Sequence, residues 1–144
     1  VLLLLWCGQA GAYTACVTGG GGFLAQELIA QLCAQGEEVV ATARGRNSYS
    51  LPALDGVKLV HGCDLLEEGS FDEAFRGAHV VFHASSPFPL SLQHANERQL
   101  VVRACVEGTL NVMRSARRAG VRRVVVTSSA AALRASGQKP VNGE

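Results

Sequence analysis

The sequence predicts an α/β fold in which a doubly wound parallel sheet is covered by helices, truncated after about the fifth strand. Strand and helix signals alternate along the chain, and the strand segments are almost wholly apolar. Strands that are apolar on both faces are typical of parallel sheets with helices on each side. A run of four glycines also lies between the first strand and the first helix. The 144 residues, 48% of them hydrophobic, suffice for one globular domain.

The first half of the chain gives a strand, a helix and two further strands. "YTACVT" (13–18) is a short apolar run that ends at the glycines. "FLAQELIAQLCAQG" (23–36) follows as a helix with Gly36 as its stop, and "EVVATA" (38–43) and "VKLVHGCD" (57–64) are the next strands. The helix places its leucines and isoleucine on one face, at Leu24, Leu28, Ile29 and Leu32.

The second half repeats the alternation. Ser70 and Glu73 have the spacing of a capping box and predict a short helix that runs through Phe75. "AHVVFHAS" (78–85) is the fourth strand, and "RRVVVTSS" (122–129) is the fifth. Between them a helical periodicity runs from Asn96 to Ala119, with apolar residues at Leu100, Ala104, Val106, Leu110 and Met113.

We divide the chain into an N-terminal extension of uncertain role at 1–12 and a dinucleotide-binding domain at 13–144. This domain is predicted to be incomplete at its C-terminus. "VLLLLW" is far shorter than the roughly 20 residues that span a bilayer, and no basic segment precedes it. We therefore interpret this apolar run as the edge of a gene model. A clipped signal peptide stays open as the alternative. The final "SGQKPVNGE" has turn-like residues and no closing element, which favours a fragment.

The content of charged residues, cysteines and histidines limits which binding partners, cellular compartment and metal sites the sequence predicts. Thirteen basic and twelve acidic residues give a net charge of +1, which suggests no nucleic-acid or membrane-surface partner. The five cysteines show no C-x-x-C pair, and those at 16, 33 and 105 lie in apolar patterns, so we expect reduced thiols in the cytoplasm. The histidines share no metal-ligand spacing, so no metal site is predicted.

The glycine run at 19–22 is interpreted as a phosphate cradle. It lies between a strand and a helix, the context that a dinucleotide-binding Rossmann loop requires. Glycine permits the tight turn and the close approach of backbone to a pyrophosphate, and the helix N-terminus supplies free N–H groups. A small residue, Ala25, stands where helix and strand must pack closely. The alternative is a flexible strand–helix connection.

Arg44 indicates the form of the dinucleotide. A carboxylate at the end of the second strand would bind a ribose 2′-hydroxyl, but this chain has Arg44 there, with Arg46 close behind. A guanidinium suits a 2′-phosphate, which a carboxylate would repel. NADP is therefore predicted over NAD, and the alternative is a pair of solvated arginines in a loop.

Six motifs occur in the order found in the extended short-chain dehydrogenase/reductases: "TGGGGFLA", "VVATAR", "CDL", "VFHASSPFP", "VEGTLNVMRSARRAG" and "VRRVVVTSSAAAL". The chain resembles most the branch of dihydroflavonol 4-reductase, cinnamoyl-CoA reductase and the ketone/aldehyde reductases. The resemblance covers residues 13 to about 135. It implies an NADP-dependent oxidoreductase that transfers hydride from NADPH to a ketone or aldehyde.

The resemblance also implies residue roles. Ser129 would be the catalytic serine that hydrogen-bonds the substrate carbonyl, and Asn111 the helix asparagine that supports the active site. The residues implied in cofactor binding are Gly19, Gly21 and Gly22 at the pyrophosphate, with Thr18, Phe23 and Leu24 beside them in the chain, Arg44 at the 2′-phosphate, Asp64 and Leu65 at the adenine, Ala84, Ser85 and Ser86 at the ribose, and Thr127 and Ser128 beside the nicotinamide.

From the residues alone, several of these positions have simpler explanations. The hydroxyls of "TSSA" could cap the next segment, Asn111 could be a polar surface residue, and Asp64 could be a turn carboxylate. His83 lies in an apolar strand, where a hydrogen-bonded core histidine is favoured over a catalytic base. These alternatives remain open at the level of sequence.

The family's Tyr-x-x-x-Lys pair is absent from these residues, because the only tyrosines, Tyr13 and Tyr49, have no lysine four positions on. A fragment that carries the cofactor half of a reductase is the favoured hypothesis. An NAD-dependent 3β-hydroxysteroid or sterol dehydrogenase is the nearest enzyme alternative. A non-catalytic NADP sensor or an inert isoform is the alternative from another class. The sequence determines neither the substrate nor the oligomeric state.

Overall fold

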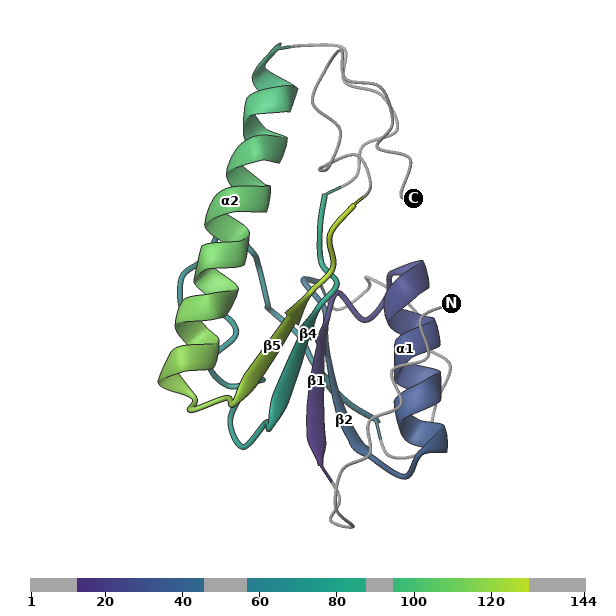
Figure 1. Ribbon diagram of the computed structural model, residues 1–144. Coiled ribbons are helices and arrows are strands. Elements are labelled where there is room, and N and C mark those ends of the chain that lie inside the picture. Colours follow the sequence, from purple (N-terminus) through teal and green to yellow (C-terminus); the bar gives the residue numbers. More distant parts are fainter. Residues whose placement is uncertain (1–12, 46–56, 88–94, 130–144) are drawn as a thin grey trace, which may run out of the picture.

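The computed structural model describes residues 13–45, 57–87 and 95–129. Strand and helix alternate within them, as the sequence predicts (Figure 1). The elements are β1 (Thr14–Thr18), α1 (Phe23–Ala34), β2 (Glu38–Thr42), β3 (Val57–Val60), β4 (Val80–His83), α2 (Ala95–Arg118) and β5 (Arg123–Val126). The strands are shorter than predicted, since residues beyond their apolar centres form connections.

The five strands form one parallel sheet in the order β3-β2-β1-β4-β5. The chain moves outward in one direction from β1 and then returns to add β4 and β5 on its other side. The helices α1 and α2 lie on opposite faces of this sheet (Figure 1). This is a doubly wound Rossmann-type sheet, so the predicted fold class is confirmed. Such a sheet opens a crevice at its carboxyl edge where the strand order reverses.

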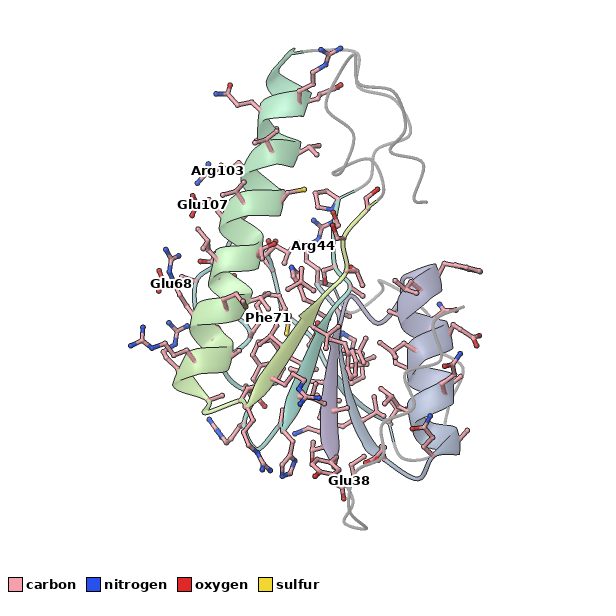
Figure 2. The ribbon with its side chains drawn as sticks, in the orientation of Figure 1. Glu38, Arg44, Glu68, Phe71, Arg103 and Glu107 are labelled. Carbon is pink, nitrogen blue, oxygen red and sulfur yellow. The ribbon has the colours of Figure 1, made fainter. Side chains whose placement is uncertain are left out.

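Alternate residues of β1 contribute to two separate cores, because successive side chains of a strand point to opposite faces. Val17 packs on the α1 side, in a cluster with Ala25, Ile29, Val39 and Ala41. Cys16 packs on the α2 side, in a larger cluster whose buried members include Phe71, Phe75, Val81, Val112 and Ala116. Figure 2 shows Phe71 between the sheet and α2. The two cores fix both helices against the strands, and thereby the loops at the carboxyl edge.

The predicted short helix from Ser70 through Phe75 is wrong, since this segment is a run of turns. Its hydrogen bonds include Asp72 N to Gly69 O at 3.0 Å and Phe75 N to Phe71 O at 3.1 Å, without a continuous helical ladder. Ser70 does not form the predicted cap, because its hydroxyl hydrogen-bonds the backbone of Asp64 on both sides. So short a segment has little helical stability of its own, and burial of two phenylalanines decides its shape instead.

Helix α2 buries small residues rather than its large apolar ones. Its sheet-facing side includes Gly108, Val112, Ser115 and Ala116. Among the residues of the predicted periodicity, Leu100, Val106, Leu110 and Met113 are all more than 40% exposed. Small residues let the helix approach the sheet closely. Cys105 lies in an apolar sequence pattern, yet it is exposed on this helix.

The first turn of α1 differs similarly from the prediction. Leu24 belongs to the predicted apolar face but is 54% exposed, whereas Ala25 and Ile29 are buried. The small Ala25 faces the sheet, so the helix axis can come close to β1. In the described part of the chain, neither helix is long and apolar enough to cross a membrane.

An ion-pair cluster joins the C-terminal end of α2 to the turns after β3. The Arg118 guanidinium donates to both carboxylate oxygens of Asp72, at 2.9 and 3.1 Å at its closest, and to Glu68 at 3.5 Å. It lowers the pKa of the Asp72 carboxyl through these hydrogen bonds. This cluster holds the turn segment against α2 from its solvent side.

Candidate functional site

A crevice of about 430 Å³ lies at the carboxyl ends of the strands. We call it the carboxyl-end crevice. Nine of the predicted cofactor-binding residues line it: Gly19, Gly21, Gly22, Arg44, Asp64, Leu65, Ala84, Ser85 and Ser86. They come from the ends of four strands that are separated widely in sequence. The structure adds six lining residues that the sequence did not single out: Thr42, Ala43, Cys63, Leu66, Pro87 and Ala104.

The glycine loop is shaped by contacts that exclude larger side chains. Gly19 has a φ of +68°, and a Cβ on it would lie 2.7 Å from Ser85 Oγ. Gly20 is not among the predicted cofactor-binding residues, yet a Cβ there would lie 2.9 Å from the Cβ of Ala41. Its N–H donates to Thr42 O at 2.9 Å, which fixes the loop on β2. Two of the four glycines are therefore required by the packing of the loop against β2 and the end of β4.

Helix α1 begins beside the loop with an open N-terminus. Its N-cap residue Gly22 has extended backbone and no capping side chain, and no acidic residue occurs in the first turn. Gln26 stabilises the loop instead, since its Nε2 donates to Gly21 O at 3.2 Å. The first N–H groups of a helix lack partners within the helix and carry partial positive charge, so this end suits an anion.

Arg44 follows β2 and is exposed at the crevice (Figure 2). Its backbone carbonyl accepts the N–H of Gly62 at 3.2 Å, and Cys63 N donates to Ala43 O at 3.2 Å. These bonds continue the pairing of β2 with β3 beyond the strands. They hold the Arg44 backbone at the crevice wall and place no constraint on its guanidinium.

The connection after β3 forms the neighbouring wall. The Asp64 carboxylate accepts the N–H of Leu66 at 2.9 Å, which makes a tight turn. The Ser70 hydroxyl donates to Asp64 O at 2.7 Å and accepts the Asp64 N–H at 3.1 Å. One oxygen of the Asp64 carboxylate thus shapes its own turn, and the backbone on both sides of this residue is fixed.

A buried hydrogen-bond network lies beneath the crevice and ties β1, β4 and α2 together. Thr18 Oγ1 accepts the N–H of Ser85 at 3.2 Å and lies 2.9 Å from Nδ1 of His83. His83 Nε2 lies 3.3 Å from Thr109 Oγ1, so both ring nitrogens have a hydrogen-bond partner. Burial lowers the pKa of His83, which favours the neutral ring. His83 is thus a hydrogen-bonded core histidine, as favoured from the sequence.

The other predicted residues lie outside the lining of the carboxyl-end crevice. Thr127, Ser128 and Ser129 follow β5 and are exposed. The N–H and the hydroxyl of Thr127 both donate to His83 O, at 3.1 and 3.0 Å, which ties this segment to the end of β4. The remainder are Thr18, which is buried below the crevice, Phe23 and Leu24, which are exposed at the start of α1, and Asn111, which is buried on α2.

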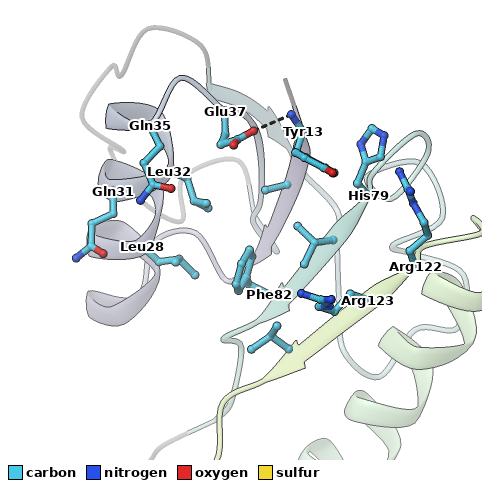
Figure 3. Close-up of a pocket in the computed structure, with 13 residues that line it drawn as sticks. Tyr13, Leu28, Gln31, Leu32, Gln35, Glu37, His79, Phe82, Arg122 and Arg123 are labelled. Carbon is cyan, nitrogen blue, oxygen red and sulfur yellow. Dashed lines mark hydrogen bonds between the residues drawn. The ribbon is translucent and has the colours of Figure 1, made fainter. Parts of the chain in front are cut away.

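A second cavity, of about 270 Å³, lies on one face of the sheet, between α1 and the strands β4 and β5 (Figure 3). Its rim includes Tyr13, Glu37, His79 and Arg122, which precede β1, β2, β4 and β5. The N–H of Tyr13 donates to Glu37 Oε2 at 2.7 Å (Figure 3). Its floor is apolar and it contains no glycine loop. Ligands of open α/β sheets bind at the carboxyl edge, so the carboxyl-end crevice is the candidate cofactor site.

The described residues contain no cluster of side chains that could hold a metal ion. Their four cysteines are free thiols, of which Cys16 and Cys63 are buried. Burial raises the pKa of the Cys63 thiol to about 11 and raises that of Cys16 further. Both thiols are therefore protonated core groups at neutral pH.

A family model matches almost the whole chain, from residue 15 to residue 144, and describes the NAD dependent epimerase/dehydratase family. The chain belongs to this family. The tetraketide alpha-pyrone reductase 1 of Arabidopsis thaliana is 42% identical over 128 residues, and the match covers 83% of this chain. The cinnamoyl-CoA reductase CAD2 of Medicago truncatula is 38% identical over 131 residues, with 85% of this chain covered. The resemblance to extended short-chain dehydrogenase/reductases is thereby confirmed.

The same likeness extends to solved structures. The crystal structure of Gre2 in complex with NADPH from Candida albicans superposes with a TM-score of 0.70, at 28% identity, over 83% of this chain. The chain spans 38% of Gre2, 38% of the Arabidopsis relative and 40% of the Medicago relative. The comparison therefore covers about two fifths of these proteins.

Proposed function

We propose that this chain is the cofactor-binding part of an NADP-dependent reductase that reduces a ketone or aldehyde. One observation carries the proposal: the glycine loop and Arg44 line a single crevice at the carboxyl edge of a doubly wound sheet. The NADPH bound to the related Gre2 structure supports the same cofactor. When bound, NADPH would supply the hydride that reduces the carbonyl carbon.

The glycine loop fits a pyrophosphate. Gly19, Gly21 and Gly22 line the crevice and carry no side chain, so a ligand can approach the main chain closely. The uncapped N-terminus of α1 adjoins it with free N–H groups. These groups would bind the diphosphate oxygens without needing a basic side chain.

Arg44 would bind the 2′-phosphate at the other end of the same wall. Its guanidinium is an always-charged donor with fork geometry, which suits phosphate oxygens. Asp64 and Leu65, on the adjacent strand end, would contact the adenine, and Ala84, Ser85 and Ser86 would line the ribose. The backbones of Arg44, Asp64 and Ser85 are held by hydrogen bonds at strand ends or in the turn after β3.

Ser129 would donate a hydrogen bond to the carbonyl oxygen of the substrate. Hydride transfer to a carbonyl leaves negative charge on that oxygen, so a positioned donor stabilises the transition state. Thr127 and Ser128 would lie beside the nicotinamide, and the anchoring of Thr127 to His83 O holds this segment next to β4. A serine hydroxyl is a weak acid, so the proton would come from another group.

Titration of the purified protein with NADPH and with NADH, by calorimetry or nucleotide fluorescence, tests the cofactor assignment. NADPH should bind more tightly. Arg44→Ala should weaken NADPH binding by about tenfold to a hundredfold, the range expected for a charged hydrogen bond, and should leave NADH binding nearly unchanged. Arg76→Ala is the matched control, since Arg76 is exposed on the turn segment. Equal affinities for both nucleotides, or an Arg44→Ala variant that binds NADPH like the wild type, would contradict the proposal.

The reductase assignment is tested in the longest natural polypeptide that contains this chain. We expect oxidation of NADPH with carbonyl substrates and a large loss of kcat in Ser129→Ala. NADPH binding without turnover of any ketone or aldehyde would instead favour a non-catalytic NADP-binding protein.

A further inference from the structure

Helix α2 contacts the adenine wall of the carboxyl-end crevice through two residues, Asn111 and Gly108. The buried Asn111 amide donates from Nδ2 to Leu65 O at 2.9 Å. Its Oδ1 accepts a hydrogen bond from Arg114 Nη1 at 3.0 Å. The cation therefore fixes the orientation of the amide, with the oxygen toward Arg114 and the NH₂ group toward the turn that contains Leu65.

Gly108 lies one helical turn earlier on α2 and presses on the same residue. A Cβ on Gly108 would lie 2.8 Å from the Cβ of Leu65 and 3.3 Å from its Cγ and Cδ2. Only a glycine lets the helix come this close to the turn. Since Leu65 lines the crevice, a shift of α2 or of this turn changes the wall itself.

The turn is thus held from both ends. Ser70 and the Asp64 carboxylate fix the backbone at Asp64 and Leu66, and α2 fixes Leu65 between them. These bonds all join groups of the protein itself, so the shape of the turn is preorganised. Preorganised walls bind more tightly, because binding does not have to order them.

We propose that Asn111 and Gly108 are positioning residues for the adenine end of the cofactor, acting through Leu65. This inference rests on the proposed function, since it assumes that the Asp64–Leu65 turn receives adenine. It differs from the role that the family resemblance implies for Asn111, which is support of the catalytic end. Both polar atoms of the Asn111 side-chain amide are hydrogen-bonded, Nδ2 to Leu65 O at the adenine wall and Oδ1 to Arg114.

Asn111→Asp tests the contact with almost no change in volume. A carboxylate can still accept from Arg114, but it has no donor for Leu65 O, so two oxygens would face each other in a buried place. Affinity should be measured by calorimetry with 2′,5′-ADP, which carries the adenine and 2′-phosphate but no nicotinamide. We expect about tenfold weaker binding of 2′,5′-ADP, the cost of ordering the Leu65 wall when the nucleotide binds, and a similar factor for NADPH.

Gly108→Ala is an independent variant that displaces the same wall by steric contact, and it should weaken 2′,5′-ADP in the same way. Met113→Ala is the matched control, because Met113 is 44% exposed on the same helix. A thermal melt of each variant confirms that the protein measured is folded. In the longest natural polypeptide, Asn111→Asp should raise the KM for NADPH and leave kcat nearly unchanged.

The outcomes separate the two proposals. If the wild type binds neither NADPH nor 2′,5′-ADP, the proposed function fails. If the wild type binds both and the folded Asn111→Asp and Gly108→Ala variants bind 2′,5′-ADP equally well, the positioning role is overturned. A loss of kcat with unchanged 2′,5′-ADP affinity would place Asn111 at the catalytic end instead.

Discussion

Replacing Gly19 by alanine is expected to destabilise the protein and to distort the phosphate end of the crevice. Two separate costs arise at this position. The backbone has a φ of +68°, which side chains with a Cβ adopt unfavourably, and the new Cβ would lie 2.7 Å from Ser85 Oγ and 3.2 Å from Ser85 Cα. Rotation of the serine hydroxyl relieves only the first contact. Ser85 itself is held by its N–H to Thr18, so the loop must move.

Gly120 allows the two costs to be separated. It has nearly the same φ, +70°, and a Cβ there would meet nothing within 4 Å. Gly120→Ala should therefore show the conformational cost alone, about 1–2 kcal/mol. Gly19→Ala should show the same cost plus about 1–3 kcal/mol of steric overpacking, or about 2–5 kcal/mol in total.

Urea denaturation of both variants, followed by circular dichroism, measures these free energies of unfolding. The double variant Gly19→Ala/Ser85→Ala removes the nearest atom and should recover at least about 0.5 kcal/mol relative to the sum of the single changes. Only Gly19→Ala should also weaken NADPH binding, since Gly120 lies outside the crevice. A Gly19→Ala variant that is as stable as Gly120→Ala would refute the steric argument.

Two further predictions concern buried titratable groups. Burial lowers the pKa of His83 below the ordinary 6.5, so the unfolded chain takes up a proton that the folded protein does not bind. The free energy of unfolding should therefore fall by up to about 1.4 kcal/mol per pH unit as the pH drops from 6.5 toward the lowered pKa. His83→Gln, which keeps hydrogen-bonding groups but does not titrate, should reduce this slope in denaturation curves at pH 7.5 and 5.5, and an unchanged slope would assign the effect elsewhere. Iodoacetamide should label the exposed Cys105 of the native protein well before Cys16 and Cys63, because burial shields these two thiols and raises their pKa values. Mass spectrometry of the peptides over time measures the order of labelling. Early labelling of either buried thiol would contradict the described core.

The alternation of apolar runs and glycine stops was sufficient to predict the parallel sheet. It gave the five strands and the two helices, with the α2 bounds within one residue of the prediction at each end. Local patterns succeeded here because a strand buried on both faces must be apolar throughout. The prediction of a helix after Ser70 was wrong because it rested on the spacing of neighbouring residues alone. The shape of this segment is set instead by contacts beyond it, through the burial of Phe71 and Phe75 and the bonds of Ser70 to Asp64.

The candidate site shows the same division. Gly19, Arg44 and Asp64 could be predicted, because each follows a strand and such ends meet at one edge of the sheet. The need for glycine at position 20 could not, since it arises from the Cβ of Ala41 on a neighbouring strand. The cofactor-binding and catalytic roles of all the predicted site residues stay predictions.

The sequence by itself determined the class of sheet, the place of the glycine loop and the positive charge after β2, because periodicity and strand ends are properties of consecutive residues. Only the tertiary structure decided which side chains meet. It directed the Asn111 amide to Leu65, paired His83 with Thr18 and Thr109, and turned the small residues of α2 rather than the large ones to the sheet. These contacts join residues far apart in the chain, and their geometry depends on how closely the helix and the strands approach one another in the folded protein.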